Sequence, residues 1–332
     1  MRAMVLGAFG GPDNVNLARL ETPRLAPGEV LVRVQAASVN PVDVRIRNGL
    51  PIGPALPAVL GADLAGTVEA IGEGVADLVP GDEVYGCAGG VKGLGGTFAE
   101  YIAADARLLA PKPKSLSMIE AAALPLVSIT AWNCMTRADV CASDHVLVHG
   151  GCGGVGHIAI QLAKARGARV ATTVSSTEKA AFARKLGADD TILYPREPVQ
   201  GYVDRLTAGH GFDVVVDTVG GNSLDHSLQA AAPLGRVVAT AARSTHDLSP
   251  MHGKALSLHV VFMLIPLLSG IGREAHGRIL RELVALVENE SVRPLIDPER
   301  FTLDRLPDAF RRLESGQALG KVVVEIAGHF DA

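Results

Sequence analysis

The 332-residue sequence has few cysteines and no large excess of charge of either sign. Its four cysteines show no C-x-x-C spacing, so we expect reduced thiols in a cytoplasmic protein. The formal net charge of −4 provides no strongly basic surface, which argues against nucleic acid as a main partner.

A long hydrophobic run is also absent. The most apolar later segment, residues 256–271, is interrupted by His259 and Pro266 and is too short to span a membrane. Residues 1–7 lack the apolar core and cleavage site of a signal peptide, and their alternating pattern predicts a first strand. The composition is that of a soluble globular protein with room for two domains.

Glycines cluster directly after an apolar segment at residues 146–149. Three of them stand in G-x-G-x-x-G order, and apolar residues then recur at helical spacing. The first glycine permits a tight turn, the second lets backbone approach a pyrophosphate, and the third lets the helix pack against the strand. Strand, turn and helix together predict a Rossmann dinucleotide cradle. Its expected cofactor-binding residues are Gly151, Gly153, Gly154, Val155 and Gly156.

The next expected strand, residues 168–174, indicates which dinucleotide is bound. A unit that prefers NAD usually ends this strand with Asp or Glu, but here the first acid is Glu178. Ser175, Ser176 and Lys179 offer two hydroxyls and a cation to a 2′-phosphate, which favours NADP(H). A helix N-cap for one serine and a solvated Lys179 form the alternative, and the two sets of roles are compatible.

The predicted pattern of secondary structure changes after residues 111–114. Before them, short alternating segments and turn residues predict a small, mostly antiparallel β domain. Ser117 and Glu120 form an expected capping box that opens an Ala-rich helix. Strands and helices then alternate, which predicts a parallel sheet covered on both faces. The expected strands lie near residues 146–149, 169–174, 191–193, 213–217, 236–240 and 258–262.

The residues beyond 270 are expected to return to the β domain. They include predicted helices at 278–289 and 306–315 and a final strand at 321–326. The substrate site is expected in the cleft between the two domains, where pockets preferentially form. The last strand of the parallel sheet would be an exposed hydrophobic edge, so we predict a homodimer that pairs through it.

Several motifs follow one another along the chain: Ser38–Asp43 with Arg47 and Gly49, Gly61–Gly66, Gly81–Gly86, Ala121–Leu124 with Thr130 and Ala131, the glycine loop, and Gly320–Val323. Together they resemble the medium-chain dehydrogenase/reductase superfamily, specifically its zinc-free quinone oxidoreductase branch, over essentially the whole length. The resemblance implies an α/β fold in which a Rossmann NADP-binding domain interrupts a GroES-like catalytic domain. The expected bounds are 123–263 for the Rossmann domain and 1–122 with 264–332 for the catalytic domain.

The same resemblance bears on metal binding. Zinc alcohol dehydrogenases of the superfamily carry a Cys near the start of the first motif and Gly-His-Glu in the second, whereas this chain has Asn40 and Gly61–Asp63. A catalytic zinc needs three protein ligands of the Cys, His or carboxylate type. The structural zinc lobe with its four close cysteines is also missing, because Cys87 stands alone. We therefore expect no zinc.

The absence of a metal limits the chemistry that the resemblance implies. Without a Lewis acid to lower the pKa of an alcohol, oxidation of an unactivated alcohol is difficult. An electron-poor acceptor already stabilises negative charge after hydride arrives, so the protein needs mainly to orient it and donate hydrogen bonds. We predict an NADPH-dependent reductase of quinones or α,β-unsaturated carbonyls (enones or enals). The alternatives are reduction of an enoyl thioester and a non-catalytic NADPH-binding sensor.

Asn40 and Arg45 are the candidate catalytic residues. In relatives the motif of Asn40 reaches the nicotinamide, where an amide donates to the substrate oxygen or holds the ribose; bracing of the loop at Pro41 is the alternative. Arg45 stands where some relatives have a Tyr, and it stabilises an enolate if it faces the cleft, or is otherwise a solvated surface residue. Asp43 is expected to be structural and paired with Arg47.

Further cofactor contacts are implied by the resemblance. Thr130 approaches the nicotinamide carboxamide, or else its hydroxyl is satisfied within its own helix. Lys321 pairs with the cofactor, or else guards an edge strand. Phe262 and Met263 wall the nicotinamide pocket or pack in the core. The remaining implied contacts are Tyr194, Val219, Gly220, Thr240 and Ala241.

His149 and Cys152 flank the cradle. His149 closes a buried strand and is expected to be a packed core imidazole. Cys152 stands at a helix N-terminus, which tends to lower the pKa of a thiol. Modification of Cys152 by electrophiles or oxidants, which would block cofactor binding, is therefore one hypothesis, and an inert small residue is the other.

Overall fold

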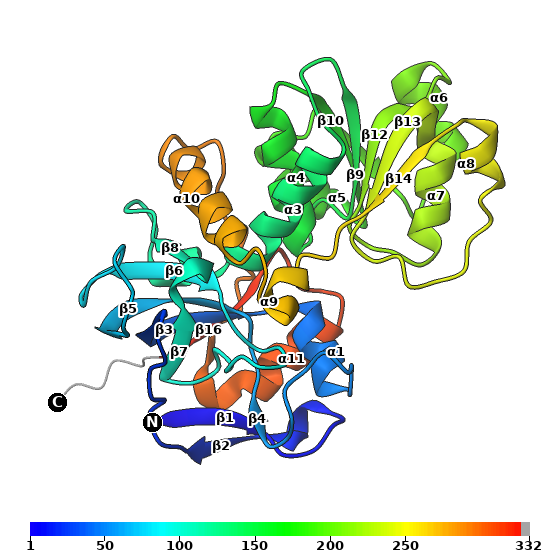
Figure 1. Cartoon of the computed structure of the whole chain (residues 1–332). Helices are drawn as coiled ribbons and strands as arrows, with labels where there is room; N and C mark the ends of the chain where they lie inside the picture. Colours follow the sequence, from blue (N-terminus) through cyan, green and yellow to red (C-terminus); the bar gives the residue numbers. More distant parts are fainter. Residues whose placement is uncertain (327–332) are drawn as a thin grey trace. The chain divides into compact units, whose positions relative to one another are not determined.

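The computed structural model describes residues 1–326, and the chain divides into two compact units. The first, called the β unit, consists of Met1–Leu126, Leu264–Glu290 and the described residues from Pro294 on. The second, called the parallel-sheet unit, consists of Val127–Met263 with Ser291–Arg293. Figure 1 labels the helices and strands of both units.

The β unit contains two sheets (Figure 1). In the smaller one, β1 (Arg2–Leu6) pairs with β2 (Val15–Arg19) and with β4 (Ala58–Val59). The larger sheet has the order β15-β16-β3-β5-β6-β8, with β7 paired to β3. Its strands are β3 (Glu29–Val39), β5 (Asp63–Ile71), β6 (Glu83–Cys87), β7 (Tyr101–Asp105), β8 (Leu109–Pro111), β15 (Phe301–Thr302) and β16 (Val322–Glu325).

The central strand β3 follows from its sequence pattern. Val30, Val32 and Val34 are buried and alternate with less buried residues, as the two-residue period of a strand requires. Residues 36–39 are all buried, because both faces of the strand are covered at this end. The helices of the unit are α1 (Pro41–Arg47), α2 (Met118–Ala122), α9 (Ile265–Ser269), α10 (Glu274–Glu288) and α11 (Leu306–Glu314), with 3₁₀ turns η1 (Pro12–Asn14), η2 (Ala106–Leu108) and η3 (Leu303–Arg305).

The parallel-sheet unit has six strands in the order β11-β10-β9-β12-β13-β14. The chain leaves β9 for β10 on one side and later returns to β12 on the other. Ligands of such sheets bind beyond the carboxyl ends of the strands at this reversal. The strands are β9 (His145–His149), β10 (Arg169–Val174), β11 (Asp190–Leu193), β12 (Phe212–Asp217), β13 (Ala231–Ala239) and β14 (Ser257–Val260). The helices are α3 (Pro125–Arg137), α4 (Gly154–Ala165), α5 (Thr177–Lys185), α6 (Val199–Thr207), α7 (Asn222–Ala230) and α8 (Ser249–Gly253).

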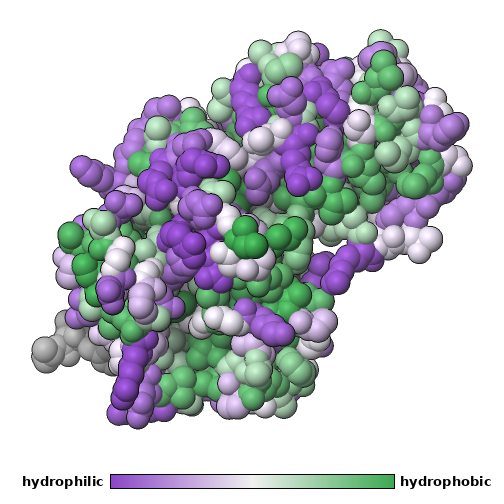
Figure 2. All heavy atoms as spheres, in the orientation of Figure 1, coloured by the Kyte–Doolittle hydropathy of each residue, from purple (hydrophilic) through white to green (hydrophobic). Residues whose placement is uncertain are grey.

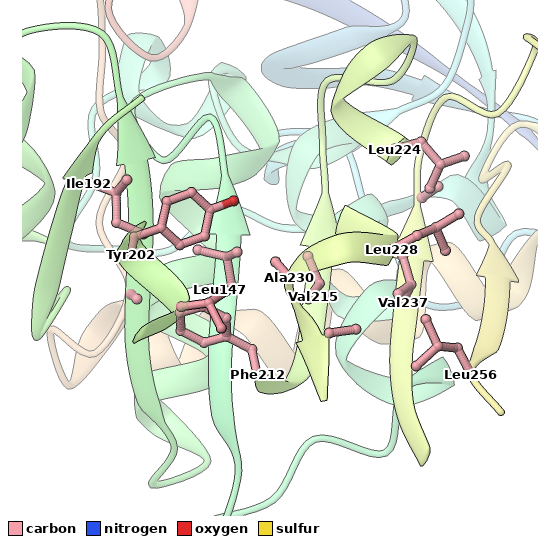
Figure 3. Packing of buried hydrophobic residues seen from close by; sticks show 14 residues of the cluster. Leu147, Ile192, Tyr202, Phe212, Val215, Leu224, Leu228, Ala230, Val237 and Leu256 are labelled. Carbon is pink, nitrogen blue, oxygen red and sulfur yellow. The ribbon is translucent and has the colours of Figure 1, made fainter. Parts of the chain in front are cut away.

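One face of this sheet is packed with aliphatic and aromatic side chains (Figure 3). Leu147, Val215 and Val237 come from the neighbouring strands β9, β12 and β13. Phe212 and Leu228 extend the same cluster and are completely buried. Parallel strands are covered on both faces, which explains why they are nearly continuous apolar runs in the sequence.

The expected alternation of strands and helices is confirmed. Five of the six predicted strands of the parallel sheet agree with the structure to within two residues at each end, whereas β13 begins at Ala231 instead of residue 236. The predicted helices and strand beyond residue 270 are present as α10, α11 and β16 in the β unit. The capping box is also confirmed, since Ser117 Oγ accepts a hydrogen bond from the Glu120 N–H at 3.3 Å. Within residues 1–326, none of the helices has both the length and the hydrophobicity of a membrane span.

The predicted pairing of Asp43 with Arg47 is wrong. The Asp43 carboxylate accepts a hydrogen bond from the backbone N–H of Asn40 at 2.7 Å, because the two residues form the capping box of α1. The buried Arg47 guanidinium instead donates to both carboxylate oxygens of Glu314, at 2.6 and 3.1 Å, and to the carbonyl of Gly10. Arg47 therefore joins α1 to α11 inside the β unit.

We expect the Glu314→Ala substitution to lower the free energy of unfolding by about 3 kcal/mol, because it leaves a buried guanidinium without its counter-charge. Urea denaturation measures the change. The matched control is Glu69→Ala, whose partner Arg33 lies 3.5 Å away at a site where both side chains are about half exposed, so its effect is expected to stay below about 1 kcal/mol. Equal effects of the two substitutions would contradict this account.

Candidate functional site

The glycine loop joins β9 to α4 at the reversal of strand order. A Cβ at Gly151 would overlap Thr172 Oγ1, and a Cβ at Gly156 would overlap the carbonyl of Gly150. At Gly153, the N-cap of α4, the nearest atom to an added Cβ would be the Gly150 oxygen at 3.2 Å. Packing of the protein itself thus requires the first and third glycines, whereas the second leaves room for an approaching ligand.

Strand β10 braces the loop from one side. The Thr173 hydroxyl accepts a hydrogen bond from the Gly150 N–H at 3.0 Å, and the Thr173 carbonyl accepts one from the Gly151 N–H at 3.2 Å. The Thr172 hydroxyl donates to the Val148 carbonyl at 2.7 Å. These contacts hold the turn at the N-terminus of α4, where free N–H groups favour a bound anion.

The loop that follows β12 lies beside the same end of the sheet. Asp217 accepts hydrogen bonds from the N–H groups of Val219 and Gly220, at 2.8 and 3.0 Å, and the neighbouring Thr218 hydroxyl donates to the His149 carbonyl at 2.7 Å. The Thr240 N–H donates to the Asp217 carbonyl. A Cβ at Gly220 would approach the Ala241 carbonyl to 2.5 Å. The structure therefore brings four of the expected cofactor residues together: Val219, Gly220, Thr240 and Ala241.

The end of β10 presents the groups considered for the 2′-phosphate. Ser175 is exposed, and Ser176 Oγ accepts a hydrogen bond from the Lys179 N–H at 3.2 Å. The expected N-cap role of a serine is therefore confirmed. The Cys152 thiol donates to the Lys179 carbonyl at 3.1 Å, so the first turn of α5 touches the glycine loop.

The two residues that flank the cradle are both buried. Desolvation lowers the pKa of His149 to about 4, so the ring is neutral near pH 7, as expected for a packed core imidazole. Burial raises the pKa of the Cys152 thiol, and the nearby Lys179 charge does not reverse this effect. This direction favours the alternative of an inert small residue, because desolvation outweighs the position at a helix terminus.

Four further predicted cofactor residues lie elsewhere in the parallel-sheet unit. Thr130 is buried within α3, and Met263 is buried beyond β14. Tyr194, directly after β11, and Phe262 are both about half exposed. Their roles toward a cofactor stay predictions.

In the β unit, Asn40 belongs to a buried cluster of polar groups. Its Nδ2 donates to Asp63 Oδ2 at 2.9 Å, and its Oδ1 accepts from the Lys321 ammonium. Lys321 also lies 3.4 Å from Asp63 and donates to the Val39 carbonyl. Ser38 Oγ donates to Asp63 at 2.9 Å. The amide of Asn40 is thus held at both ends by charged groups.

Burial dominates the electrostatics of this cluster. Desolvation, with the charge of Asp63 adding to it, raises the pKa of Asp43 to about 7, although the hydrogen bond from Asn40 opposes the shift. Desolvation likewise lowers the pKa of Lys321 and raises that of the Cys87 thiol. The attraction between Lys321 and Asp63 opposes the penalty on both charges.

The positions of the catalytic candidates follow from these contacts. Asn40 and Lys321 are almost completely buried, whereas Arg45 is exposed on α1. The edge-strand alternative for Lys321 is wrong, because the residue precedes β16, which lies between β15 and β3. Among residues 1–326, no group of three His, Cys, Asp or Glu side chains is arranged to hold a metal ion.

Asp63 is the central residue of this cluster that the sequence analysis did not select. Besides Ser38 and Asn40, it accepts a hydrogen bond from the Leu126 N–H at 2.8 Å. A signal was present, because Asp63 and Lys321 are charged residues of opposite sign in otherwise apolar strand segments. A buried charge needs a partner, so the two could have been paired from the sequence.

Comparison with known proteins adds to this geometry. Residues 26–114 match the alcohol dehydrogenase GroES-like domain family, and residues 154–265 match the zinc-binding dehydrogenase family. The NADPH-dependent alkenal/one oxidoreductase of Arabidopsis thaliana chloroplasts is 35% identical over 98% of this chain and 79% of its own length.

Solved structures agree with this grouping. An alcohol dehydrogenase superfamily protein from Novosphingobium aromaticivorans is 42% identical, with a TM-score of 0.94 over 98% of this chain and 100% of its own. Escherichia coli quinone oxidoreductase, solved in complex with NADPH, is 27% identical, with a TM-score of 0.87 over 98% and 100% of the two chains. The chain therefore belongs to the medium-chain dehydrogenase/reductase superfamily, in the branch that contains the quinone and alkenal/one oxidoreductases.

Proposed function

We propose that this protein is an NADPH-dependent reductase that transfers hydride to quinones or α,β-unsaturated carbonyls without a metal ion. The observation that carries the proposal is the glycine loop, where the protein's own packing explains Gly151 and Gly156 but not the missing side chain at Gly153. A pyrophosphate that approaches the N-terminus of α4 accounts for it. The Arabidopsis NADPH-dependent alkenal/one oxidoreductase and the Escherichia coli quinone oxidoreductase, which binds NADPH, support the same conclusion.

In this proposal an NADP(H)-binding Rossmann domain spans residues 123–263, which include most of the parallel-sheet unit. Backbone N–H groups of the glycine loop hold the pyrophosphate, and Ser175, Ser176 and Lys179 hold the 2′-phosphate. Bound NADPH supplies a hydride. The other proposed contacts are Thr130, Tyr194, Val219, Gly220, Thr240, Ala241, Phe262 and Met263 from the same unit, with Asn40 and Lys321 from the catalytic domain, 1–122 and 264–332.

The β unit would supply the groups that orient the acceptor. The Asn40 amide is fixed by Lys321 and Asp63, and such a fixed amide suits a positioning role. Arg45, exposed on α1, is the cation that would stabilise a developing enolate. An electron-poor acceptor needs no Lewis acid, in keeping with Asn40 and Ala62 at the positions where zinc relatives carry a Cys and a His.

The exposed edge of the parallel sheet supports a homodimer. β14 is the last strand of the sheet, and Val260 and Phe262 are about half exposed. Figure 2 shows hydrophobic residues over the part of the unit where β14 lies. Pairing of two β14 strands would cover this edge.

A cytoplasmic location is also proposed, in keeping with four cysteines that form no disulfide.

Substitution of two glycines separates folding from cofactor binding. Gly156→Ala is expected to lower the free energy of unfolding by about 1–3 kcal/mol, because its Cβ meets the Gly150 carbonyl. Gly153→Ala is expected to lower the free energy of unfolding by less than about 1 kcal/mol but to raise the Kd for NADPH on the order of 10-fold. Denaturation and fluorescence titration measure the two effects. Unchanged NADPH binding by the Gly153 variant would contradict the cradle.

Lys179→Ala tests the preference for NADPH. Loss of a charge-assisted contact is expected to raise the Kd for NADPH by about 10-fold or more, while the Kd for NADH stays unchanged. Lys185→Ala, at the other end of α5, is the matched control. Equal changes for NADPH and NADH would show that Lys179 does not contact the 2′-phosphate.

The activity itself is tested with purified protein, NADPH and a panel of benzoquinones, naphthoquinones, enals and enones. We expect turnover that prefers NADPH over NADH and is unchanged after dialysis against a chelator, because no catalytic metal is involved. Enoyl thioesters added to the panel test the alternative in which the protein reduces an enoyl thioester. Tight NADPH binding without any turnover would favour the sensor instead, and loss of activity with the chelator would contradict metal independence.

A further inference from the structure

A second constellation of reactive side chains lies between the segment that follows β13 and the first turn of α7 (Figure 1). Ser244 Oγ lies 2.6 Å from His246 Nε2. His246 Nδ1 lies 2.9 Å from Asp225 Oδ1. A hydroxyl, an imidazole and a carboxylate thus form a continuous hydrogen-bonded chain.

The order of these contacts determines what each group does. The Asp225 carboxylate only accepts hydrogen bonds, so it selects the tautomer of His246 with the proton on Nδ1. Nε2 then has a free lone pair and accepts the proton of the Ser244 hydroxyl. A nucleophile, a base and a group that orients the base are the three parts of an activated serine, whatever the fold.

Within this hydrogen-bonded chain the imidazole is the most shielded group, and both the carboxylate and the hydroxyl reach solvent. The side chain of His246 is 8% exposed and that of Asp225 is 38% exposed, while Ser244 is exposed to solvent. The base is therefore shielded and held in place, and the nucleophile is accessible to a molecule in solution.

The segment from residue 241 to residue 248 also contains backbone N–H groups that donate to no other described residue. Free N–H groups close to a nucleophile are the donors that stabilise the oxyanion formed on an attacked carbonyl. This combination distinguishes Ser244 from Ser249, whose hydroxyl donates to the Asp247 carboxylate instead.

From these contacts we propose that Ser244 is an acyl-accepting nucleophile, activated by His246 and Asp225, that reacts with small activated esters. Ser244 Oγ forms a bond to the acyl carbon while its proton passes to His246 Nε2. The C–O bond to the leaving alcohol or phenol breaks, and that group leaves with the electron pair and takes a proton. Water then attacks the acyl-serine by the same route and regenerates the hydroxyl.

The test uses the full-length protein with p-nitrophenyl acetate. We expect p-nitrophenolate release together with one acetyl group on the peptide that contains Ser244, detected by mass spectrometry. Ser244→Ala abolishes this adduct, and Ser244→Cys, which keeps a nucleophile, retains it. His246→Gln and Asp225→Asn each lower the rate of acylation on the order of 100-fold or more.

Ser249→Ala, at the first residue of α8, is the matched control. This variant is expected to keep the wild-type rate of acylation. Far-ultraviolet circular dichroism and the Kd for NADPH establish that every variant is folded, so a lost adduct reports on chemistry. Acetylation confined to lysines, or an undiminished rate in Ser244→Ala, would overturn the proposal. A rate unaffected by both His246→Gln and Asp225→Asn would equally do so.

Discussion

The tight turn between β9 and α4 is the constraint on which the parallel-sheet unit depends. Gly156 lies so close to the Gly150 carbonyl that only a glycine fits, and this contact sets α4 against the sheet with its N-terminus at the reversal of strand order. Thr172 and Thr173 of β10 brace the turn with hydrogen bonds. The same backbone geometry that satisfies packing therefore creates a site for an anion.

The β unit is organised around a different interaction, the buried attraction between Lys321 and Asp63. The two charges immobilise the amide of Asn40 and join β16 to β3 and β5. Asn40 and Ala62 stand where zinc relatives are expected to carry a Cys and a His. In this chain an ammonium group supplies the positive charge of the cluster, and the reduction of electron-poor acceptors makes no demand for a stronger Lewis acid.

Most of the fold could be predicted because its signals are local. Apolar runs, glycine turns and the Ser117 capping box each reveal an element within a few residues. The pairing of side chains was harder to predict from the sequence, as Arg47 shows. Its partner Glu314 is 267 positions away, and the prediction chose the nearby Asp43 instead. For Cys152, the helix terminus was visible in the sequence, but the degree of burial that raises its pKa depends on packing.

The central claim is that the protein transfers a hydride from NADPH to an electron-poor acceptor. The most direct measurement follows deuterium from NADPH labelled at the reactive carbon of the nicotinamide into an enone. The account predicts a product with deuterium at its β-carbon, at a rate that falls when Gly153 is replaced by alanine. A reduced product that contains no deuterium from NADPH, or bound NADPH that reduces no acceptor, would contradict it.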